Sequence, residues 1–235
     1  MIENEQGQLV RFRLRPAQEL LFRTMWYLNI ILKARQLGFS TAIDIYLLDE
    51  ALFNKNLKCG IIAQDLTAAG EIYRTKIEVP FDNLPGWLKA QFKVVTRRGG
   101  ANGGHILFRH GSSIQVATSF RSGTVQRLHV SEHGKICAKY PEKAKEVRTG
   151  TLNAIHPGAI AFIESTAEGV GGDFHAMSMK SLELARASGE LSQLDWKFHF
   201  FAWWQDPKYR ADVPASGVVM SKTQAEYFAA VEKSM

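Results

Sequence analysis

The segment covering residues 28–53 constrains the fold more than any other part of the chain. It opens with an apolar run typical of a buried strand, continues through a short basic loop that ends at Gly38, and then shows a helical pattern over 40–53. Strand, loop and helix in this order suit a phosphate-binding loop, because backbone N–H groups at a helix start can face an anion. A hydroxyl there, such as that of Ser40, can bind Mg²⁺.

The letters of this segment depart from the usual phosphate-loop pattern, G-x-x-x-x-G-K-[ST]. With Gly38 and Ser40 aligned, Phe39 takes the position of the usual lysine and Lys33 takes that of the first glycine. An ordinary strand-to-helix turn is therefore the alternative interpretation of the segment.

Composition indicates a globular domain with a full core. The chain has 235 residues, 46% of them hydrophobic, and no apolar run approaches the ~20 residues of a membrane span. The polar, acidic N-terminus is not a secretory signal. Two cysteines, Cys59 and Cys137, form no disulfide framework, so a reducing cytoplasm is the simplest interpretation.

Positive charge is concentrated in one part of the sequence. The net charge is +6, and residues 83–131 contain no Asp or Glu. That stretch carries seven basic residues: Lys89, Lys93, Arg97, Arg98, Arg109, Arg121 and Arg127. Such a stretch attracts the phosphates of a nucleotide or a nucleic acid. The alternative is a solvated basic surface that acids elsewhere in the fold balance.

Strand-like and helix-like patterns alternate along the chain. Strands are predicted at 28–32, 59–63, 125–130, 159–163 and 196–202, and helices at 16–25, 40–53, 66–77 and 173–188. Pro80 and Pro85 should break the chain, 97–104 should be a flexible basic loop, and 105–118 should form a hairpin. The alternation predicts an α/β fold with a mostly parallel central sheet and helices on both faces.

The C-terminal part differs in character. Residues 1–210 are predicted to form one domain, and 211–235 a linker followed by the start of a helix that opens near Ser221. Ser221 and Gln224 have the spacing of a capping box.

Glu132 follows the apolar strand 128–131. In a P-loop NTPase, an acid at a strand tip beside the loop polarises the attacking water and helps hold Mg²⁺. The usual pair is Asp-Glu, but Ser131 occupies the first position here. The alternative is a strand-end glutamate in solvent. His129, Glu132 and His133 also spell a zinc-peptidase motif, which requires a helix where this segment indicates a strand and a turn.

Small hydroxyl residues mark the end of the next strand, in the sequence Glu164-Ser165-Thr166-Ala167-Glu168-Gly169. At a strand tip beside a phosphate, such residues can sense the γ-phosphate. A polar strand-to-loop turn is the alternative.

Taken together, these motifs resemble the ATPase domain of the tailed-bacteriophage large terminase, the motor that packages DNA into the procapsid. The resemblance covers roughly residues 12–210 and rests on five motifs in order. These are Arg15-Pro16-Ala17-Gln18, Lys33–Thr41, His129–Lys135, Glu164–Gly169 and Phe200–Pro207.

The resemblance implies a P-loop NTPase of the additional-strand type that uses ATP and Mg²⁺. It assigns Gln18 to adenine reading, Lys33 and Arg35 to the phosphates, and Ser40 and Glu132 to Mg²⁺. Glu132 becomes the catalytic acid. The ATP-binding loop consists of Lys33, Ala34, Arg35, Gln36, Leu37, Gly38, Phe39, Ser40 and Thr41, and the coupling motif of Ser165, Thr166 and Ala167.

Packaging motors resemble ring ATPases that complete each active site with an arginine from a neighbouring subunit. Arg121, in the basic stretch, is the candidate for this role, with Arg35 assisting within its own subunit.

The expected partners are double-stranded DNA, the portal protein, the terminase small subunit and further copies in a ring, in the host bacterial cytoplasm. The nuclease domain of the family would begin about where this chain stops. Two alternatives stay open: another nucleic-acid-translocating P-loop ATPase, such as a helicase-like motor, and a degenerate P-loop domain that binds DNA or partners without hydrolysis.

Overall fold

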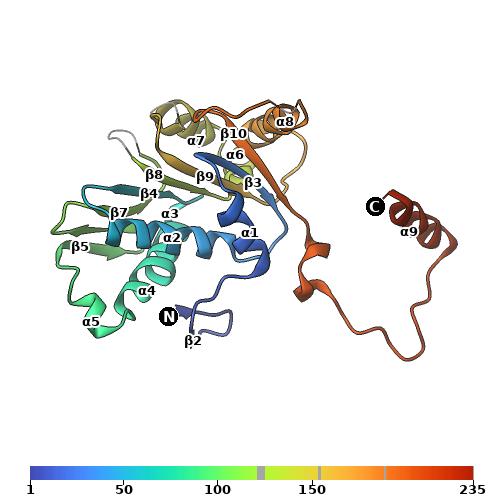
Figure 1. The fold of residues 1–235 in the computed structure, drawn as a ribbon, viewed down its shortest axis with the longest axis horizontal. Coiled ribbons are helices and arrows are strands. Elements are labelled where there is room, and N and C mark those ends of the chain that lie inside the picture. Colours follow the sequence, from blue (N-terminus) through green and yellow to red (C-terminus); the bar gives the residue numbers. More distant parts are fainter. Residues whose placement is uncertain (121–124, 153–154, 188, 235) are drawn as a thin grey trace. The chain divides into compact units, whose positions relative to one another are not determined.

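The structure, a computed structural model, describes residues 1–120, 125–152, 155–187 and 189–234. The chain divides into two compact units, residues 1–203 and residues 204–235. The smaller unit contains a short 3₁₀ turn, η5 (Pro207–Tyr209), and helix α9 (Lys222–Ser234). All other helices and strands described below belong to the larger unit (Figure 1).

An eight-stranded sheet forms the centre of the larger unit. Its strands, in spatial order, are β10 (Trp196–Phe201), β3 (Leu28–Lys33), β9 (Ile160–Ser165), β8 (Arg127–Ser131), β4 (Lys58–Ile62), β7 (Ser113–Ala117), β6 (Gly103–Phe108) and β5 (Val94–Gly100). The first six are mutually parallel, and β6 and β5 extend the sheet in antiparallel fashion. The predicted mostly parallel sheet is thus confirmed. A separate pair, β1 (Ile2–Glu3) and β2 (Leu9–Val10), is antiparallel.

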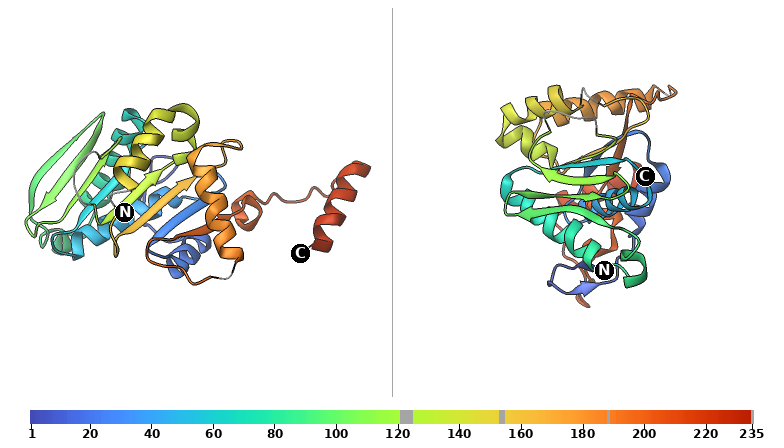
Figure 2. Two further views of the ribbon diagram at one scale, coloured as in Figure 1. Left: turned by 90° about the horizontal axis from the view of Figure 1, so that it is seen from above. Right: turned by 90° about the vertical axis from the view of Figure 1, so that its left-hand side faces the viewer.

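Helices cover both faces of the sheet (Figure 2). Neighbouring strand residues point to opposite sides: Ile31 joins one hydrophobic cluster and Ile30 the other. The first cluster includes residues of α1 (Pro16–Thr24), α2 (Phe39–Phe53), α3 (Leu66–Ile72), the π-helical turn η1 (Tyr73–Glu78) and α4 (Val79–Asp82). The second includes α6 (His133–Lys139), α7 (Pro141–Glu146), the π-helical turn η2 (Val147–Thr151) and α8 (Gly172–Arg186). Parallel strands buried on both faces explain the continuous apolar runs in the sequence.

The strand order makes this an additional-strand arrangement. Strand β9 lies between β3, which leads into the loop, and β8, which leads to Glu132. The carboxyl ends of all three strands meet at one edge of the sheet, where ligands of such folds bind.

The predicted flexible loop at 97–104 is wrong, because these residues belong to the β5–β6 hairpin. Its glycines serve packing: a Cβ atom at Gly99 or Gly104 would lie within 2.5 Å of the Tyr73 ring. The hairpin therefore covers the buried Tyr73 closely, an arrangement that glycine alone permits.

Two other segments differ from expectation. Pro80 does not break the chain, because it occupies an early position of α4, where a missing N–H costs little. The predicted turn after Glu132 is a helix start, and α6 and α7 follow it. Helix α5 (Gly86–Lys89) follows Pro85. Among the helices described, none is long and apolar enough to cross a membrane.

Candidate nucleotide-binding site

The loop between β3 and α2 turns through left-handed backbone at two residues. Gln36 has φ 55° and Gly38 has φ 70°. A Cβ atom at Gly38 would lie 2.7 Å from Nε2 of Gln18, so glycine is required here by both conformation and space. No side chain of the described residues caps α2. The first N–H groups of this 15-residue helix are therefore available to an anion.

Phe39 explains the missing loop lysine. Its side chain is fully buried, and its ring centre lies 4.5 Å from that of Phe201 at the end of β10. Position 39 thus faces the core and cannot direct a cation toward a phosphate. A lysine that contacts an anion on this loop would have to come from another position.

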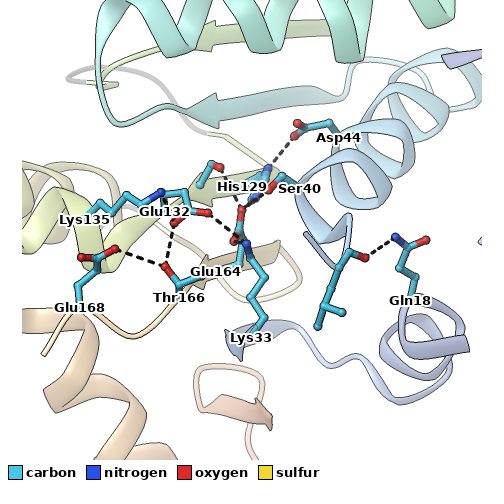
Figure 3. A network of polar contacts seen from close by, with 12 residues as sticks. Gln18, Lys33, Ser40, Asp44, His129, Glu132, Lys135, Glu164, Thr166 and Glu168 are labelled. Carbon is cyan, nitrogen blue, oxygen red and sulfur yellow. Dashed lines mark hydrogen bonds and ion pairs between the residues drawn. The ribbon is translucent and has the colours of Figure 1, made fainter. Parts of the chain in front are cut away.

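Lys33, the last residue of β3, lies where it can supply that charge. Its Nζ is 3.1 Å from Oε1 of Glu132 and 3.0 Å from Oε2 of Glu164, and its side chain is 6% exposed (Figure 3). Burial opposes the charge on this ammonium, but the two carboxylates outweigh burial and raise the pKa of Lys33.

Glu164 is the central acid of the site. The sequence did not indicate that its side chain would lie beside Lys33 and Ser40. It lies near the end of β9, just before Ser165, is fully buried, and is beside Ser131 in the β8–β9 register. Its Oε1 accepts hydrogen bonds from Ser40 Oγ at 2.6 Å and from Ser131 Oγ at 3.0 Å. Burial alone would raise the pKa of Glu164, yet Lys33 and His129 lower it.

His129 lies behind Glu164, in the interior. Its Nδ1 is 2.6 Å from Oδ1 of Asp44 on α2, and its Nε2 is 3.5 Å from Oε1 of Glu164. Burial disfavours the charged imidazole, but the two acids together raise the pKa of His129 to about 9. Asp44, His129, Glu164, Lys33, Glu132 and Lys135 form a row of alternating charges, which we call the buried charge row.

Glu132 is the most accessible acid of this row. It caps the start of α6 in left-handed backbone, with φ 55° and ψ 45°, a conformation that non-glycine residues adopt rarely and often at functional sites. Its Oε2 lies 3.1 Å from Nζ of Lys135, and its side chain is 20% exposed. The left-handed turn places Oε1 of the carboxylate 3.1 Å from Nζ of Lys33.

Of the predicted coupling residues, Thr166 lies against the same acid. The hydroxyl of Thr166 is 3.5 Å from Oε2 of Glu132 and 3.4 Å from Glu168. Ser165 is buried, and within the described residues its Oγ has no hydrogen-bond partner; a Cβ atom at Gly134 would lie 2.7 Å from it. Ala167 lines a small apolar cavity of about 150 Å³ beside α8.

Gln18 holds α1 against the loop. Its Nε2 donates to the carbonyl of Leu37 at 2.9 Å, and its Oε1 accepts from the backbone N–H of Arg15 at 3.0 Å. Arg15 also donates from its guanidinium to the carbonyl of Gln36. Adenine reading by Gln18 stays a prediction, and in this structure its amide has a structural role.

A cleft of about 380 Å³ opens beside the loop, within the size range of small-ligand sites. Its lining includes Gln18, Gln36, Gly38 and Thr41 together with residues 10–13. Its position next to the start of α2 suits the nucleoside part of a ligand whose phosphates lie on the loop.

The remaining predicted residues are distributed around this centre. Arg35 and Gln36 are exposed in the loop, Ala34 is half-buried and Leu37 is buried. Arg121 lies outside the described residues. The structure therefore brings together Lys33, Ser40, Glu132 and Thr166.

A zinc site is not supported. His129 contacts Asp44, whereas His133 contacts Asp173 at 3.4 Å on α8. In the parts of the chain that the structure describes, no three His, Cys, Asp or Glu side chains form a group that could hold a metal.

Acids from outside the acid-free stretch neutralise several of its basic residues. Arg97 pairs with Glu78 and Asp82, and Arg127 pairs with Glu50 at 2.6 Å. The charges of Arg97 and Arg127 therefore form ion pairs within the folded domain.

Solved structures share this architecture, although no family model and no curated protein matches the sequence. The ATPase domain of the Thermus phage P74-26 large terminase aligns with a TM-score of 0.53 and 16% identity over 87% of this chain and 88% of that one. The large terminase of another thermophilic bacteriophage aligns with a TM-score of 0.51 and 14% identity, and also in a complex with ADP, at 0.51 and 13%. Both of these alignments cover 92% of this chain and 49% of the other terminase. This chain therefore spans about half the length of that terminase. The chain has the fold of the phage large-terminase ATPase domains, a P-loop α/β domain.

Proposed function

We propose that this chain hydrolyses ATP to drive double-stranded viral DNA into a procapsid, as the motor domain of a terminase large subunit. One observation carries the proposal. An uncapped helix start, a lysine, a serine hydroxyl and two acids converge at the carboxyl edge of a parallel sheet. The likeness of the fold to large-terminase ATPase domains supports it.

Lys33 has the central role in binding. Its ammonium is shared by Glu132 and Glu164. We infer that the ATP phosphates, placed on the N–H groups of α2, compete for this ammonium and draw it toward themselves. Glu132 then loses one of two cations that lie 3.1 Å from its oxygens, Lys33 but not Lys135. The oxygen that faced Lys33 becomes available to accept a proton from water.

The residues present fit a Mg²⁺ ion bound with ATP. Mg²⁺ prefers oxygen ligands and uses one or two carboxylates together with substrate phosphates and water, and the Lys33 ammonium already occupies a cationic position between two carboxylates. Ser40 and Glu132, the latter through water, would hold the ion. When bound, it would neutralise charge on the phosphates.

The wider assembly follows from the same proposal. Copies of the chain form a ring on a portal protein, together with the terminase small subunit, around double-stranded DNA in the host cytoplasm. Arg121 of one copy reaches the ATP of the next, with Arg35 assisting in its own site. Residues 1–210 act as the motor, and 211–235 form a linker and helix α9.

Steady-state ATPase and binding measurements on Glu132→Gln test the catalytic assignment. The variant should bind ATP like the wild type and hydrolyse it ~10²–10⁴-fold more slowly, the usual contribution of a general base. Hydrolysis within twofold of the wild type would remove Glu132 from the mechanism. No hydrolysis by the wild type, with or without DNA, would contradict the function itself, and separation of DNA strands would indicate a helicase-like motor instead.

A further inference from the structure

We propose that Glu164 supplies, from the neighbouring strand, the carboxylate that the Mg²⁺ site lacks at Ser131. The inference rests on the proposed function, since it concerns how that site holds its metal. It makes Glu164 a positioning residue for Ser40 and for the ion.

Strand order is the first support. A P-loop site normally has an acid immediately before the catalytic glutamate, and here that position holds Ser131 on β8. Strand β9 lies between β8 and the loop strand β3. Glu164 on β9 is therefore one strand nearer to the loop than any side chain at position 131. It is also directly beside Ser131 in register.

Hydrogen bonding is the second support. The hydroxyl of Ser40 donates to Oε1 of Glu164 at 2.6 Å, and the hydroxyl of Ser131 donates to the same atom at 3.0 Å. A hydroxyl has a single hydrogen to donate and two lone pairs. Because Ser40 directs its hydrogen to Glu164, its lone pairs remain for a cation on the other side.

The cation position is the third support. Oε2 of Glu164 and Oε1 of Glu132 lie 3.0 and 3.1 Å from Nζ of Lys33, so two carboxylates already face one positive charge (Figure 3). If the phosphates draw Lys33 away, Oε2 of Glu164 is left buried without a partner cation. A hydrated divalent ion held by these residues would restore the charge balance.

The surroundings keep Glu164 in its charged form. A buried carboxylate is costly unless it is paired, and here His129 contacts the carboxylate oxygen that Lys33 does not. Asp44 in turn orients His129 from the second turn of α2, the helix that carries Ser40. The carboxylate is thus fixed by a contact that is independent of Lys33.

The alternative is that Glu164 only pairs with Lys33 and has no relation to the metal. Moving the carboxylate back to β8 separates the two ideas. In Ser131→Asp/Glu164→Gln, an acid stands at the usual position and a neutral amide of equal size replaces Glu164. A mere ion-pair partner gains nothing from this exchange, whereas a metal-positioning carboxylate is restored.

Calorimetry with ATPγS, with Mg²⁺ and with EDTA, provides the readout. The wild type should bind more tightly with Mg²⁺. Glu164→Gln should lose ~10–100-fold of that enhancement, as outer-shell partners of metal ligands typically contribute, while affinity in EDTA changes little. Ser131→Asp/Glu164→Gln should recover most of the loss. Asp82→Asn, which removes an acid of α4 that pairs with Arg97, is the matched control and should behave like the wild type.

Each outcome decides something. Glu164→Gln with an unchanged Mg²⁺ enhancement overturns the inference, and so does a double variant that stays as defective as the single one. A wild type that binds no ATPγS in either condition contradicts the proposed function instead. If circular dichroism shows that Glu164→Gln does not fold, Glu164→Asp retains the buried charge but withdraws it from Ser40 by one methylene. An unchanged Mg²⁺ enhancement in Glu164→Asp then overturns the inference.

Discussion

Two ionic clusters of the larger unit use similar residues in opposite surroundings. The buried charge row lies under the loop, where Glu164 and His129 are fully buried. The second cluster, which we call the hairpin charge cluster, joins Arg97 of β5 to Glu78 and Asp82, with Lys89 on Asp82. Its side chains are 30–40% exposed.

The two clusters differ in how strongly their ion pairs interact, because one cluster is exposed to solvent and the other is largely buried. Water and salt screen the hairpin charge cluster, so each pair there contributes little to stability. At the inner end of the buried charge row, Asp44, His129, Glu164 and Lys33 have side chains that are 0–6% exposed. These charges have lost their water, and removing one leaves its partner uncompensated. Each charged group of such a row holds its neighbours in place. Displacing one group therefore changes the charge balance of the others.

Removal of Lys33 should give the largest effect. Lys33→Met leaves the fully buried Glu164 without its nearest cation and should lower the free energy of unfolding by ~3–5 kcal/mol, the usual result of breaking a buried pair. Urea denaturation at pH 7 measures this. The control, Lys33→Met/Glu164→Gln, removes both charges and should recover part of the loss. If the free energy of unfolding of Lys33→Met is within about 1 kcal/mol of the wild-type value, the buried charge row contributes no more to stability than an exposed ion pair.

A pH effect of His129 should come second. Its pKa of about 9 in the folded protein lies above the ordinary 6.5, so its contribution is complete below pH 6.5 and is lost as the pH rises through 9. The free energy of unfolding of the wild type, compared with that of His129→Gln, should shrink by about 3 kcal/mol between pH 6 and pH 10. His133, whose pKa is also raised to about 9, titrates in both proteins and cancels. A difference that does not vary with pH would contradict a charged His129.

The hairpin charge cluster should give the smallest effect. Arg97→Ala should cost below ~1 kcal/mol in 0.1 M NaCl, and less in 0.5 M, because the pairs are screened. Its hydrogen bonds lower the pKa of Asp82 to about 2, so this stabilisation is present above the ordinary pKa and fades as the pH falls through 2. A loss equal to that of Lys33→Met would erase the contrast between the clusters.

Local patterns in the sequence were sufficient to predict the parallel strands that flank the loop. Apolar runs and the Gly38 turn specify strand β3, the loop and α2 within one short segment. The glycine-rich part of the β5–β6 hairpin was predicted to be a flexible loop. Its glycines instead make room for the Tyr73 ring, which lies about 25–30 residues earlier in the chain, so no local pattern indicates their purpose. The segment after Glu132 was predicted to be a turn, because the left-handed backbone of Glu132 at the start of α6 has no clear sequence pattern.

Sequence reasoning singled out Lys33, Ser40 and Glu132, which lie close together in the structure. It did not single out Glu164, for a topological reason. An acid after the apolar run 160–163 was visible, yet its distance from Ser40 depends on β9 lying between β3 and β8. No local pattern encodes that order. Phe39 is the complementary case: its departure from the motif became intelligible only when its ring was seen against Phe201.

The alternation within the buried charge row has a consequence for kinetics. Three carboxylates, one imidazolium and two ammonium groups sum to zero charge. Beyond a Debye length of about 10 Å a neutral row exerts almost no attraction on an approaching anion. Under the proposed function, Lys33 therefore does not steer the approach of the nucleotide. Any slowing of association by added salt would report on Arg11, Arg13 and Arg15, which line the cleft beside the loop.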